Sequence, residues 1–302
     1  MKVLFAATPA IGHVNPLLTI ARMAKARGDD VLFTTARVFT ETVEAAGARF
    51  VPLADGADLD FRNIEKVIDD WATVAPGPPQ LRKVFERGMI DPMRAQAETL
   101  RGVIAAEAPD VIVADSLFYG IAPLLLDHSR PRPPIAACGV TLLALDRPDG
   151  APPGLGLPPA RDEADRRHYA AIAAEVDAAL TTPVRAYADA KLAAMGLPKL
   201  PHSFLQSGVL LADAYLQPTV RAFEYDYGTL PPTIHFVGAL PPPPSIAPRP
   251  EWWGDLDGGR KLALVTQGTF ARDPRPACRP EGRLKMVESS GSVDEPTPRQ
   301  PA

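Results

Sequence analysis

Short apolar runs alternate with helix-like stretches through the first two thirds of the chain. The runs are rich in Val, Leu, Ile and Ala and end at Gly, Pro or Asp, which is typical of buried parallel strands. This alternation predicts an α/β fold, a doubly wound parallel sheet of the Rossmann-like type with helices on both faces. The expected strands are residues 2–7, 31–35, 49–52, 110–114 and 135–138, followed by 209–216 and 233–237.

The segments between the strands carry apolar residues at helical spacing. In the first of them Asn15 is expected to cap a helix that begins at Pro16 and ends at Gly28. Residues 139–159 are rich in Pro and Gly and have no period, which predicts a mobile loop at the carboxyl edge of the sheet. The expected helices are 16–27, 38–46, 63–73, 80–106 and 117–128, with a further helical region from 162 that Pro183 would kink or break.

Charge and cysteine content exclude several classes of protein. The net charge of -4 supplies no basic surface for nucleic acid, so no nucleic-acid partner is expected. Cys138 and Cys278 are far apart and have no CxxC neighbour, which argues against a disulfide framework or a structural zinc site. Because no signal peptide and no apolar stretch of about 18 residues is present, we expect no transmembrane segment and a cytoplasmic location.

The proline distribution predicts how the chain is organised. Its 302 residues include 35 prolines, more than twice the usual share of about 5%, and a Pro-rich spacer follows the last expected strand of the body. We therefore expect a Rossmann-like domain at 1–238, a linker at 239–258, the start of a second domain at 259–273 and a disordered tail at 274–302.

Two polar residues follow strands that should be neighbours. His13 comes after the first strand and Asp115 after the fourth, and the common strand order 3-2-1-4-5 would open both loops onto one crevice. A helix N-terminus keeps an imidazole neutral, and a carboxylate on one ring nitrogen lets the other accept a proton. Spacing alone leaves ordinary roles open: His13 could merely bond its loop, and Asp115 could cap the next helix.

Other motifs are weaker. Gly268 and Thr269 follow an apolar run at 262–266 and could contact a phosphate, although a strand that ends in Gly-Thr is often only a turn. The sequence has no GxGxxG, GxxxxGK[ST] or HExxH pattern, so dinucleotide, P-loop and metal sites lack their usual signatures. Structural roles are expected for the remaining histidines, which are His128, His168, His202 and His235.

Three segments resemble one family. Residues 7–17 (ATPAIGHVNPL) resemble the GHxxPxL opening of the two-Rossmann-domain (GT-B) nucleotide-sugar-dependent glycosyltransferases of the macrolide and UDP-glycosyltransferase type. Residues 110–120 (DVIVADSLFYG) are similar to that family's segment with the histidine-orienting aspartate, and 262–270 (LALVTQGTF) to the first strand of its nucleotide-sugar domain. The resemblance covers about residues 1–273.

The resemblance implies a reaction and a set of site residues. His13 matches the general base and Asp115 its partner, while Gly12, Gly268 and Thr269 match donor-binding positions. Such enzymes invert the anomeric carbon in one displacement, with a nucleotide-diphosphate sugar as co-substrate and no metal ion. The acceptor would be a small hydrophobic hydroxylated molecule such as a polyketide or flavonoid. Residues 61–90 and 139–160 would line the pocket that binds it. Ile11 and Phe118 are candidate acceptor-wall residues, although core packing explains them equally well.

The sequence departs from the family after residue 273. The family's donor domain normally continues for more than a hundred residues, with a His- and Gly-bearing phosphate motif and a sugar-holding Asp-Gln pair that are not found here. We therefore expect a truncated acceptor half with weak or no activity alone. The rival interpretation is a non-catalytic module, derived from a glycosyltransferase, that binds an acceptor or a partner protein. A related sugar-nucleotide epimerase is disfavoured because the Pro/Gly loops suit a separate large acceptor.

Overall fold

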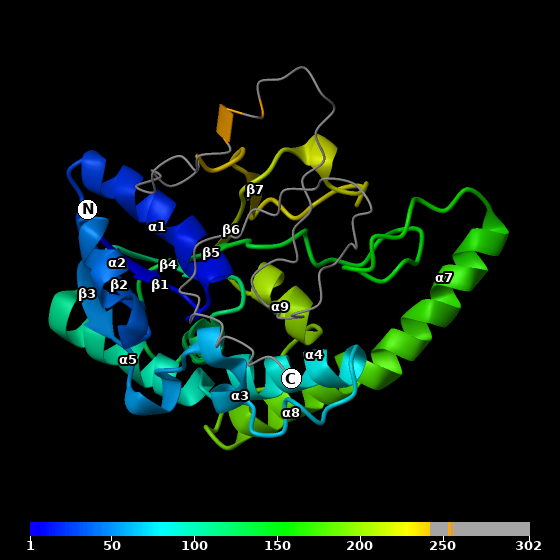
Figure 1. Ribbon diagram of the computed structural model, residues 1–302, viewed down its shortest axis with the longest axis horizontal. Coiled ribbons are helices and arrows are strands. Elements are labelled where there is room, and N and C mark those ends of the chain that lie inside the picture. The colour runs from blue at the N-terminus through cyan, green and yellow to red at the C-terminus, as the bar shows by residue number, and fades with distance from the viewer. Residues whose placement is uncertain (242–252, 255, 257–302) are drawn as a thin grey trace, which may run out of the picture. The chain divides into compact units, whose positions relative to one another are not determined.

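The computed structural model describes residues 1–241, 253, 254 and 256 (Figure 1). By its contacts the chain divides into two units, Met1–Arg249 and Pro250–Ala302, and the fold below is that of the first unit. The predicted strand at 262–266, with Gly268 and Thr269, and the predicted tail at 274–302 lie outside the described residues. Most of the predicted linker does so as well.

The described residues form one seven-stranded parallel sheet in the order β3-β2-β1-β4-β5-β6-β7 (Figure 1). The predicted α/β fold and the predicted neighbourhood of the first and fourth strands are therefore confirmed. All carboxyl ends of the strands meet at one edge, where loops can build a site. The strands are β1 (Lys2–Ala6), β2 (Asp30–Thr35), β3 (Arg49–Pro52), β4 (Val111–Asp115), β5 (Ile135–Cys138), β6 (Ala214–Gln217) and β7 (Ile234–Phe236).

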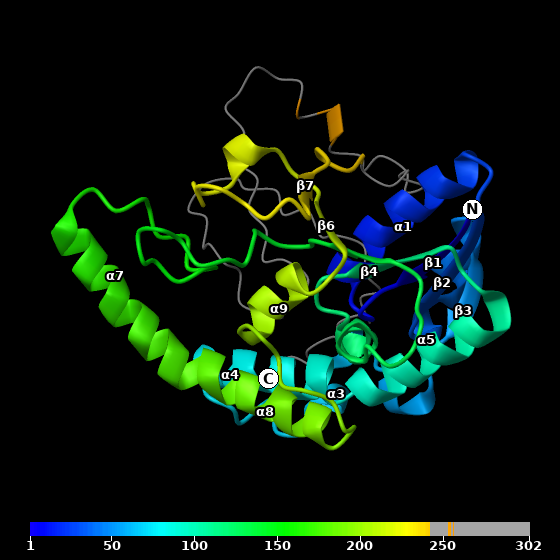
Figure 2. The same ribbon diagram turned by 180° about the vertical axis from the view of Figure 1, so that it is seen from behind.

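Helices cover both faces of the sheet. Figures 1 and 2 show α1 (Ile11–Ala26) on one side of the strands and α5 (Met93–Glu107) on the other. Successive residues of a strand point to opposite faces, so Val3 and Phe5 pack with α1 whereas Leu4 packs with α5. The remaining helices are α2 (Thr40–Ala45), α3 (Ile64–Val67), α4 (Pro78–Lys83), α6 (Ala122–Leu126), α7 (Glu163–Val176), α8 (Thr182–Ala193) and α9 (Phe204–Leu210).

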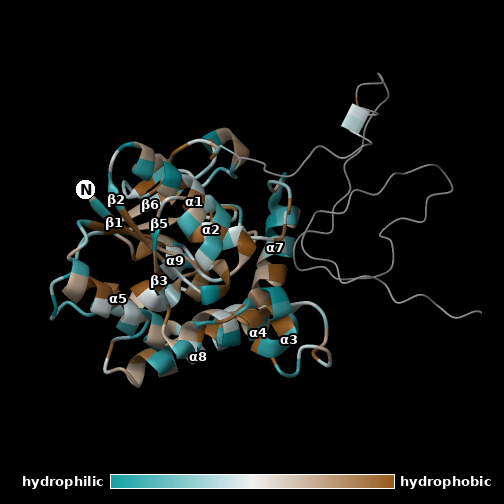
Figure 3. Cartoon of the chain, turned by 60° about the vertical axis from the view of Figure 1, so that its left-hand side comes forward, coloured by the Kyte–Doolittle hydropathy of each residue, from teal (hydrophilic) through white to brown (hydrophobic). Residues whose placement is uncertain are grey.

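A third apolar cluster joins α8 and α9 to the α5 side of the fold. Phe204 of α9 stacks on Tyr119, with ring centroids 3.9 Å apart, and both side chains are buried. Val184 and Leu192 of α8 belong to the same cluster. Figure 3 shows brown, hydrophobic residues along the strands, whereas the helices carry both brown and teal, hydrophilic residues. Within the described part of the chain, no helix combines the length and apolarity needed to cross a membrane.

The first helix begins earlier than predicted. Helix α1 starts at Ile11, after Ala10, so Asn15 lies inside it and is not its cap. Pro16 is also inside the helix. The prediction was wrong because a proline this close to a helix N-terminus removes only one backbone hydrogen bond, and tertiary packing of Val14 and Leu17 outweighs that loss.

Other element boundaries differ from the prediction. Residues 209–213 are not strand: Ser203 caps α9, which ends at Leu210, and β6 begins only at Ala214. An apolar run of this length fits a buried helix as well as a strand. Pro183 does not end the helical region: it lies at the start of α8, directly after the π-helical stretch Asp177–Thr181, so the chain stays helical there but changes helix type.

Three predicted helices are shorter or less regular than expected. The region 63–73 keeps only α3, and 117–128 keeps α6 after a 3-10 turn at Tyr119–Ile121. The region 80–106 is interrupted by a π-helical stretch, Val84–Ile90. A second π-helical stretch, Asp177–Thr181, joins α7 to α8, so the two helices form one arc in Figure 1.

Gly208 allows α9 to pack against the end of β4. A Cβ atom at this position would lie 2.3 Å from the carbonyl oxygen of Ser116. We expect Gly208→Ala to lower the free energy of unfolding by about 1–3 kcal/mol, because backbone must shift to make room. Gly102→Ala in α5 is the matched control: its Cβ meets no atom within 4 Å, and it should stabilise by about 0.5–1 kcal/mol. Urea denaturation of both variants measures the difference, and equal effects would contradict the packing argument.

Glu107 predicts a pH dependence of stability. Hydrogen bonds from Arg49, and then from Lys2, lower the pKa of Glu107 from 4.5 to about 2. A carboxyl group with a depressed pKa stabilises the fold fully above its unfolded pKa and loses that effect as the pH falls through the folded pKa. The stability difference between wild type and Glu107→Gln should thus be full at pH 7 and shrink between about pH 4.5 and 2. Urea denaturation across this range measures it, and a pH-independent difference would contradict the assignment.

Candidate active site

His13 and Asp115 lie in hydrogen-bond contact at the carboxyl edge of the sheet. His13 is in the first turn of α1 and Asp115 is the last residue of β4. The Nδ1 atom of His13 lies 2.8 Å from Oδ1 of Asp115. Because an ionised carboxylate can only accept, Nδ1 is the donor and Nε2 is left as the free acceptor of the ring. The two residues are 102 positions apart in the chain, so the parallel pairing of β1 with β4 is what brings them together.

Asp115 is fully buried and accepts further hydrogen bonds from backbone and side chain. The backbone N–H of Thr8 donates to Oδ2 at 2.5 Å, and the N–H of Leu117 donates to Oδ1 at 2.9 Å. The hydroxyl of Thr8 lies 3.3 Å from Oδ1. These donors satisfy a charge that would otherwise be costly to bury, and they fix the carboxylate in place.

Cys138 lies next to Asp115 in the sheet, since these two residues are paired in the register of β4 and β5. Burial, followed by the negative charge of Asp115, raises the pKa of the Cys138 thiol to about 12. The thiol therefore stays protonated near neutral pH and is not an activated nucleophile. The chemistry available at this edge is consequently that of the imidazole.

The geometry suits general-base catalysis. The side chain of His13 retains 12% of its exposure, whereas Asp115 retains none, so the imidazole is reachable and the carboxylate is shielded. A hydroxyl group that donates to Nε2 can transfer its proton there, and Asp115 then stabilises the imidazolium through Nδ1. Among the residues that the structure describes, no cluster of three or more His, Cys, Asp or Glu side chains could hold a metal ion.

The other predicted site residues differ in their surroundings. Gly12 faces open space, because a Cβ built there meets nothing within 4 Å, and Ile11 beside it is 39% exposed. Phe118 is fully buried in the core that contains α5. The ring packs as a core side chain, the alternative that the sequence left open, and its role as an acceptor-wall residue stays a prediction. Gly268 and Thr269 lie outside the described residues.

A cavity of about 330 Å³ lies along the ends of β5 and β6, near Pro16 of α1. Its walls combine apolar side chains such as Leu142 and Phe223 with the polar residues Thr141 and Glu224. Gly139 also lines it, and a Cβ there would lie 2.1 Å from Oε1 of Gln217, so a larger residue would have to displace the Gln217 side chain. The cavity is thus one helical turn away from the histidine, on the same edge of the sheet.

Motif spacing does not reveal every residue that shapes this edge. Thr8 holds Asp115 through its amide and hydroxyl, and only its place directly after the first strand could have indicated it. Gln217 is 2% exposed and donates to the Thr141 carbonyl and to Glu224. The contact with Thr141 joins positions that are 76 residues apart, so no local pattern predicts it.

Comparison with known proteins identifies the class. The chain is 33% identical over 289 residues to 4'-demethylrebeccamycin synthase of Lentzea aerocolonigenes, covering 95% of this chain and 68% of that protein. It is 32% identical over 278 residues to UDP-glycosyltransferase 2 of Phaeomoniella chlamydospora, covering 89% of this chain and 61% of that protein. No family model matches the chain.

A solved structure has the same fold. The glycotransferase of kitacinnamycin superposes with a TM-score of 0.53 at 19% identity, covering 83% of this chain and 55% of that one. The fold and these relatives define a glycosyltransferase of the GT-B class. The chain belongs to the family of nucleotide-sugar-dependent, UDP-glycosyltransferase-type glycosyltransferases.

Substitutions at the two residues should separate structure from chemistry. Asp115→Ala leaves the buried amide of Thr8 and the partly buried amide of Leu117 without an acceptor and should cost about 2 kcal/mol or more of stability. His13→Ala leaves both amides bonded and should cost only about 0.5–1.5 kcal/mol. Thermal or urea denaturation measures both values. A His13 variant as unstable as the Asp115 variant would show that the imidazole is mainly structural.

Proposed function

We propose that this chain takes part in the transfer of a sugar from a nucleotide-diphosphate sugar to a hydroxyl group of a small hydrophobic acceptor. The observation that carries the proposal is the 2.8 Å contact between His13 Nδ1 and Asp115 Oδ1, with the imidazole partly exposed and the carboxylate buried. This is the arrangement of a general base with an orienting partner.

In the proposed reaction, the acceptor hydroxyl donates to Nε2 of His13. As its oxygen attacks the anomeric carbon, the proton moves to Nε2, and the bond from that carbon to the diphosphate oxygen breaks. The nucleoside diphosphate leaves with the bonding electrons. Attack from the face opposite the leaving group inverts the anomeric carbon in one step. Asp115 stays ionised and stabilises the imidazolium.

The name of one relative supports the proposed class of sugar donor, and the residues around His13 support the proposed class of acceptor. One relative is named a UDP-glycosyltransferase, which fits a nucleotide-diphosphate sugar. The exposed Gly12 and Ile11 flank the base, and the neighbouring cavity is partly apolar, which fits a hydrophobic hydroxylated acceptor. We include Gly12 in the donor-contacting edge and Ile11 in the acceptor wall.

The chain spans 68% and 61% of the lengths of these two relatives. The activity of the whole enzyme is therefore a proposal for this chain. We propose that residues 1–238 form the acceptor side, joined through 239–258 to a donor side that opens at 259–273 and includes Gly268 and Thr269. The alternative, a non-catalytic module that binds only the acceptor or a partner protein, makes a different prediction for donor binding.

The test is a transfer assay with the flavonol quercetin as acceptor and UDP-glucose as donor. His13→Ala should lower the rate about 10²–10⁴-fold while the fold is kept, because a general base contributes that much. The exposed His128 gives the matched control, and His128→Ala should transfer at the wild-type rate. Equal rates for wild type and His13→Ala would remove His13 from the mechanism.

Calorimetric titration distinguishes the enzyme from the alternative, a non-catalytic module. Quercetin binding without UDP-glucose binding would support a non-catalytic module, whereas binding of both supports the enzyme.

A further inference from the structure

The segment 139–160 folds around a buried arginine although it contains no regular helix or strand. Arg147 lies within it and is only 6% exposed. A guanidinium group is always charged and is almost never buried without partners. The partners of Arg147 therefore show what holds the segment together.

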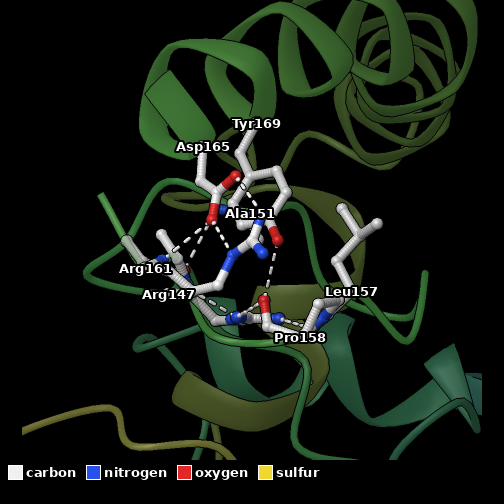
Figure 4. Close-up of polar contacts among 9 residues, drawn as sticks. Arg147, Ala151, Leu157, Pro158, Arg161, Asp165 and Tyr169 are labelled. Atoms are coloured by element: carbon white, nitrogen blue, oxygen red, sulfur yellow. Dashed lines mark hydrogen bonds and ion pairs between the residues drawn. The ribbon is translucent and has the colours of Figure 1, made fainter. Parts of the chain in front are cut away.

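The guanidinium of Arg147 binds two carbonyls from the far end of the segment (Figure 4). Nη1 donates to the carbonyl of Leu157 at 2.7 Å, and Nη2 donates to that of Pro158 at 3.1 Å. Nη2 also donates to Oδ2 of Asp149 at 2.5 Å. The Tyr225 ring lies 3.8 Å from the guanidinium carbon, as in a cation–π contact. The Arg147 side chain thus connects the part of the segment near residue 149 with the part at residues 157 and 158.

Asp149 extends this crosslink to the backbone. Its carboxylate accepts from the amides of Ala151 at 3.2 Å and Ala160 at 3.0 Å. Burial acts to raise the pKa of Asp149, but the hydrogen bonds from the Ala160 amide and from Arg147 outweigh it, and the pKa is lowered. The pair therefore stays ionised and ties residue 147 to residue 160.

Contacts with other elements anchor the segment on two sides. On one side, the hydroxyl of Tyr169 in α7 donates to the carbonyl of Pro158 at 2.9 Å (Figure 4). On the other, the hydroxyl of Tyr227 donates to the carbonyl of Leu143 at 2.6 Å, and Glu224 accepts from the amide of Leu143. The segment is thus built into the fold along its length.

The anchored segment begins at the active-site edge. Gly139 follows Cys138 at the end of β5, and Thr141 and Leu142 line the cavity near Pro16. A binding-site wall that is ordered before a ligand arrives does not lose conformational entropy on binding. Such a site binds its ligand more tightly and more selectively than one with a flexible wall. The residues of the segment that line the cavity are 139–142, so whatever fixes the rest of the segment acts on a ligand there through them.

We propose that Arg147 is the positioning residue of this wall: its guanidinium holds residues 147–160 in one conformation and stacks on Tyr225, and so restrains the cavity-lining Leu142 and Glu224, which determine which hydrophobic hydroxylated acceptor fits. The acceptor part rests on the proposed function. Lysine cannot replace arginine here, because a single ammonium group cannot bind two carbonyls and a carboxylate while lying flat on a tyrosine ring.

The direct test is amide hydrogen exchange of the full chain with Arg147→Lys and Arg147→Met. We expect peptides within 147–160 to exchange about tenfold faster or more in both variants, because at least two hydrogen bonds are lost, with unchanged protection in the sheet. Arg147→Lys keeps a positive charge beside Asp149, so it remains informative if Arg147→Met fails to fold. Wild-type exchange in Arg147→Lys would overturn the proposal.

Arg161 provides the matched control (Figure 4). It also forms an ion pair with an aspartate, Asp165, at 2.8 Å, but its side chain is 82% exposed. Arg161→Met should leave the exchange of 147–160 at the wild-type level. If it accelerates exchange as much as Arg147→Lys does, any ion pair of this region has the same effect, and the proposal fails.

Calorimetric titration with quercetin tests the effect on the acceptor. In Arg147→Lys the dissociation constant should rise about tenfold, as expected when a pre-ordered wall must be ordered on binding, while that for UDP-glucose stays unchanged. An unchanged quercetin constant beside faster exchange would overturn the specificity role. If the wild-type chain binds no quercetin, the acceptor class of the proposed function fails, and the exchange experiment still decides whether Arg147 positions the segment.

Discussion

The buried carboxylate of Asp115 is the contact on which the active-site edge depends. It accepts hydrogen bonds from the amide of Thr8 after β1, from the amide of Leu117 after β4, and from the imidazole of His13 in α1. One side chain therefore fixes the ends of two strands and the first turn of a helix relative to each other. Without those donors a buried charge would be unstable, so the same hydrogen bonds that hold the fold also orient the histidine.

The strands and their order could be predicted from local patterns, because a buried parallel strand is a short apolar run and its neighbours follow from common topology. The same reasoning placed His13 and Asp115 at one edge. The beginning of α1 could not be predicted, because packing of Val14 and Leu17 outweighs the signal of Pro16. Burial of Phe118 was one of two alternatives that the sequence left open, because it depends on packing against α5, which comes earlier in the chain.

Long-range polar contacts were the least predictable part of the site. A Pro- and Gly-rich stretch usually indicates a loop, and residues 139–160 indeed lack regular structure. What the composition does not show is that Arg147 meets carbonyls ten and eleven residues later and a ring at Tyr225. The fold of the backbone brings such partners together, so they cannot be inferred from the sequence and are seen only in the folded structure.

The buried thiol of Cys138 has a consequence for the durability of the site. Thiolates, and not thiols, react with peroxides and alkylating agents, and this sulfur is kept in its protonated form by burial and by the neighbouring carboxylate. A cysteine can thus sit directly behind the histidine–aspartate pair without offering oxidants a point of attack. Burial, and then the negative charge that orients the base, therefore keep the sulfur of the neighbouring strand in its unreactive thiol form.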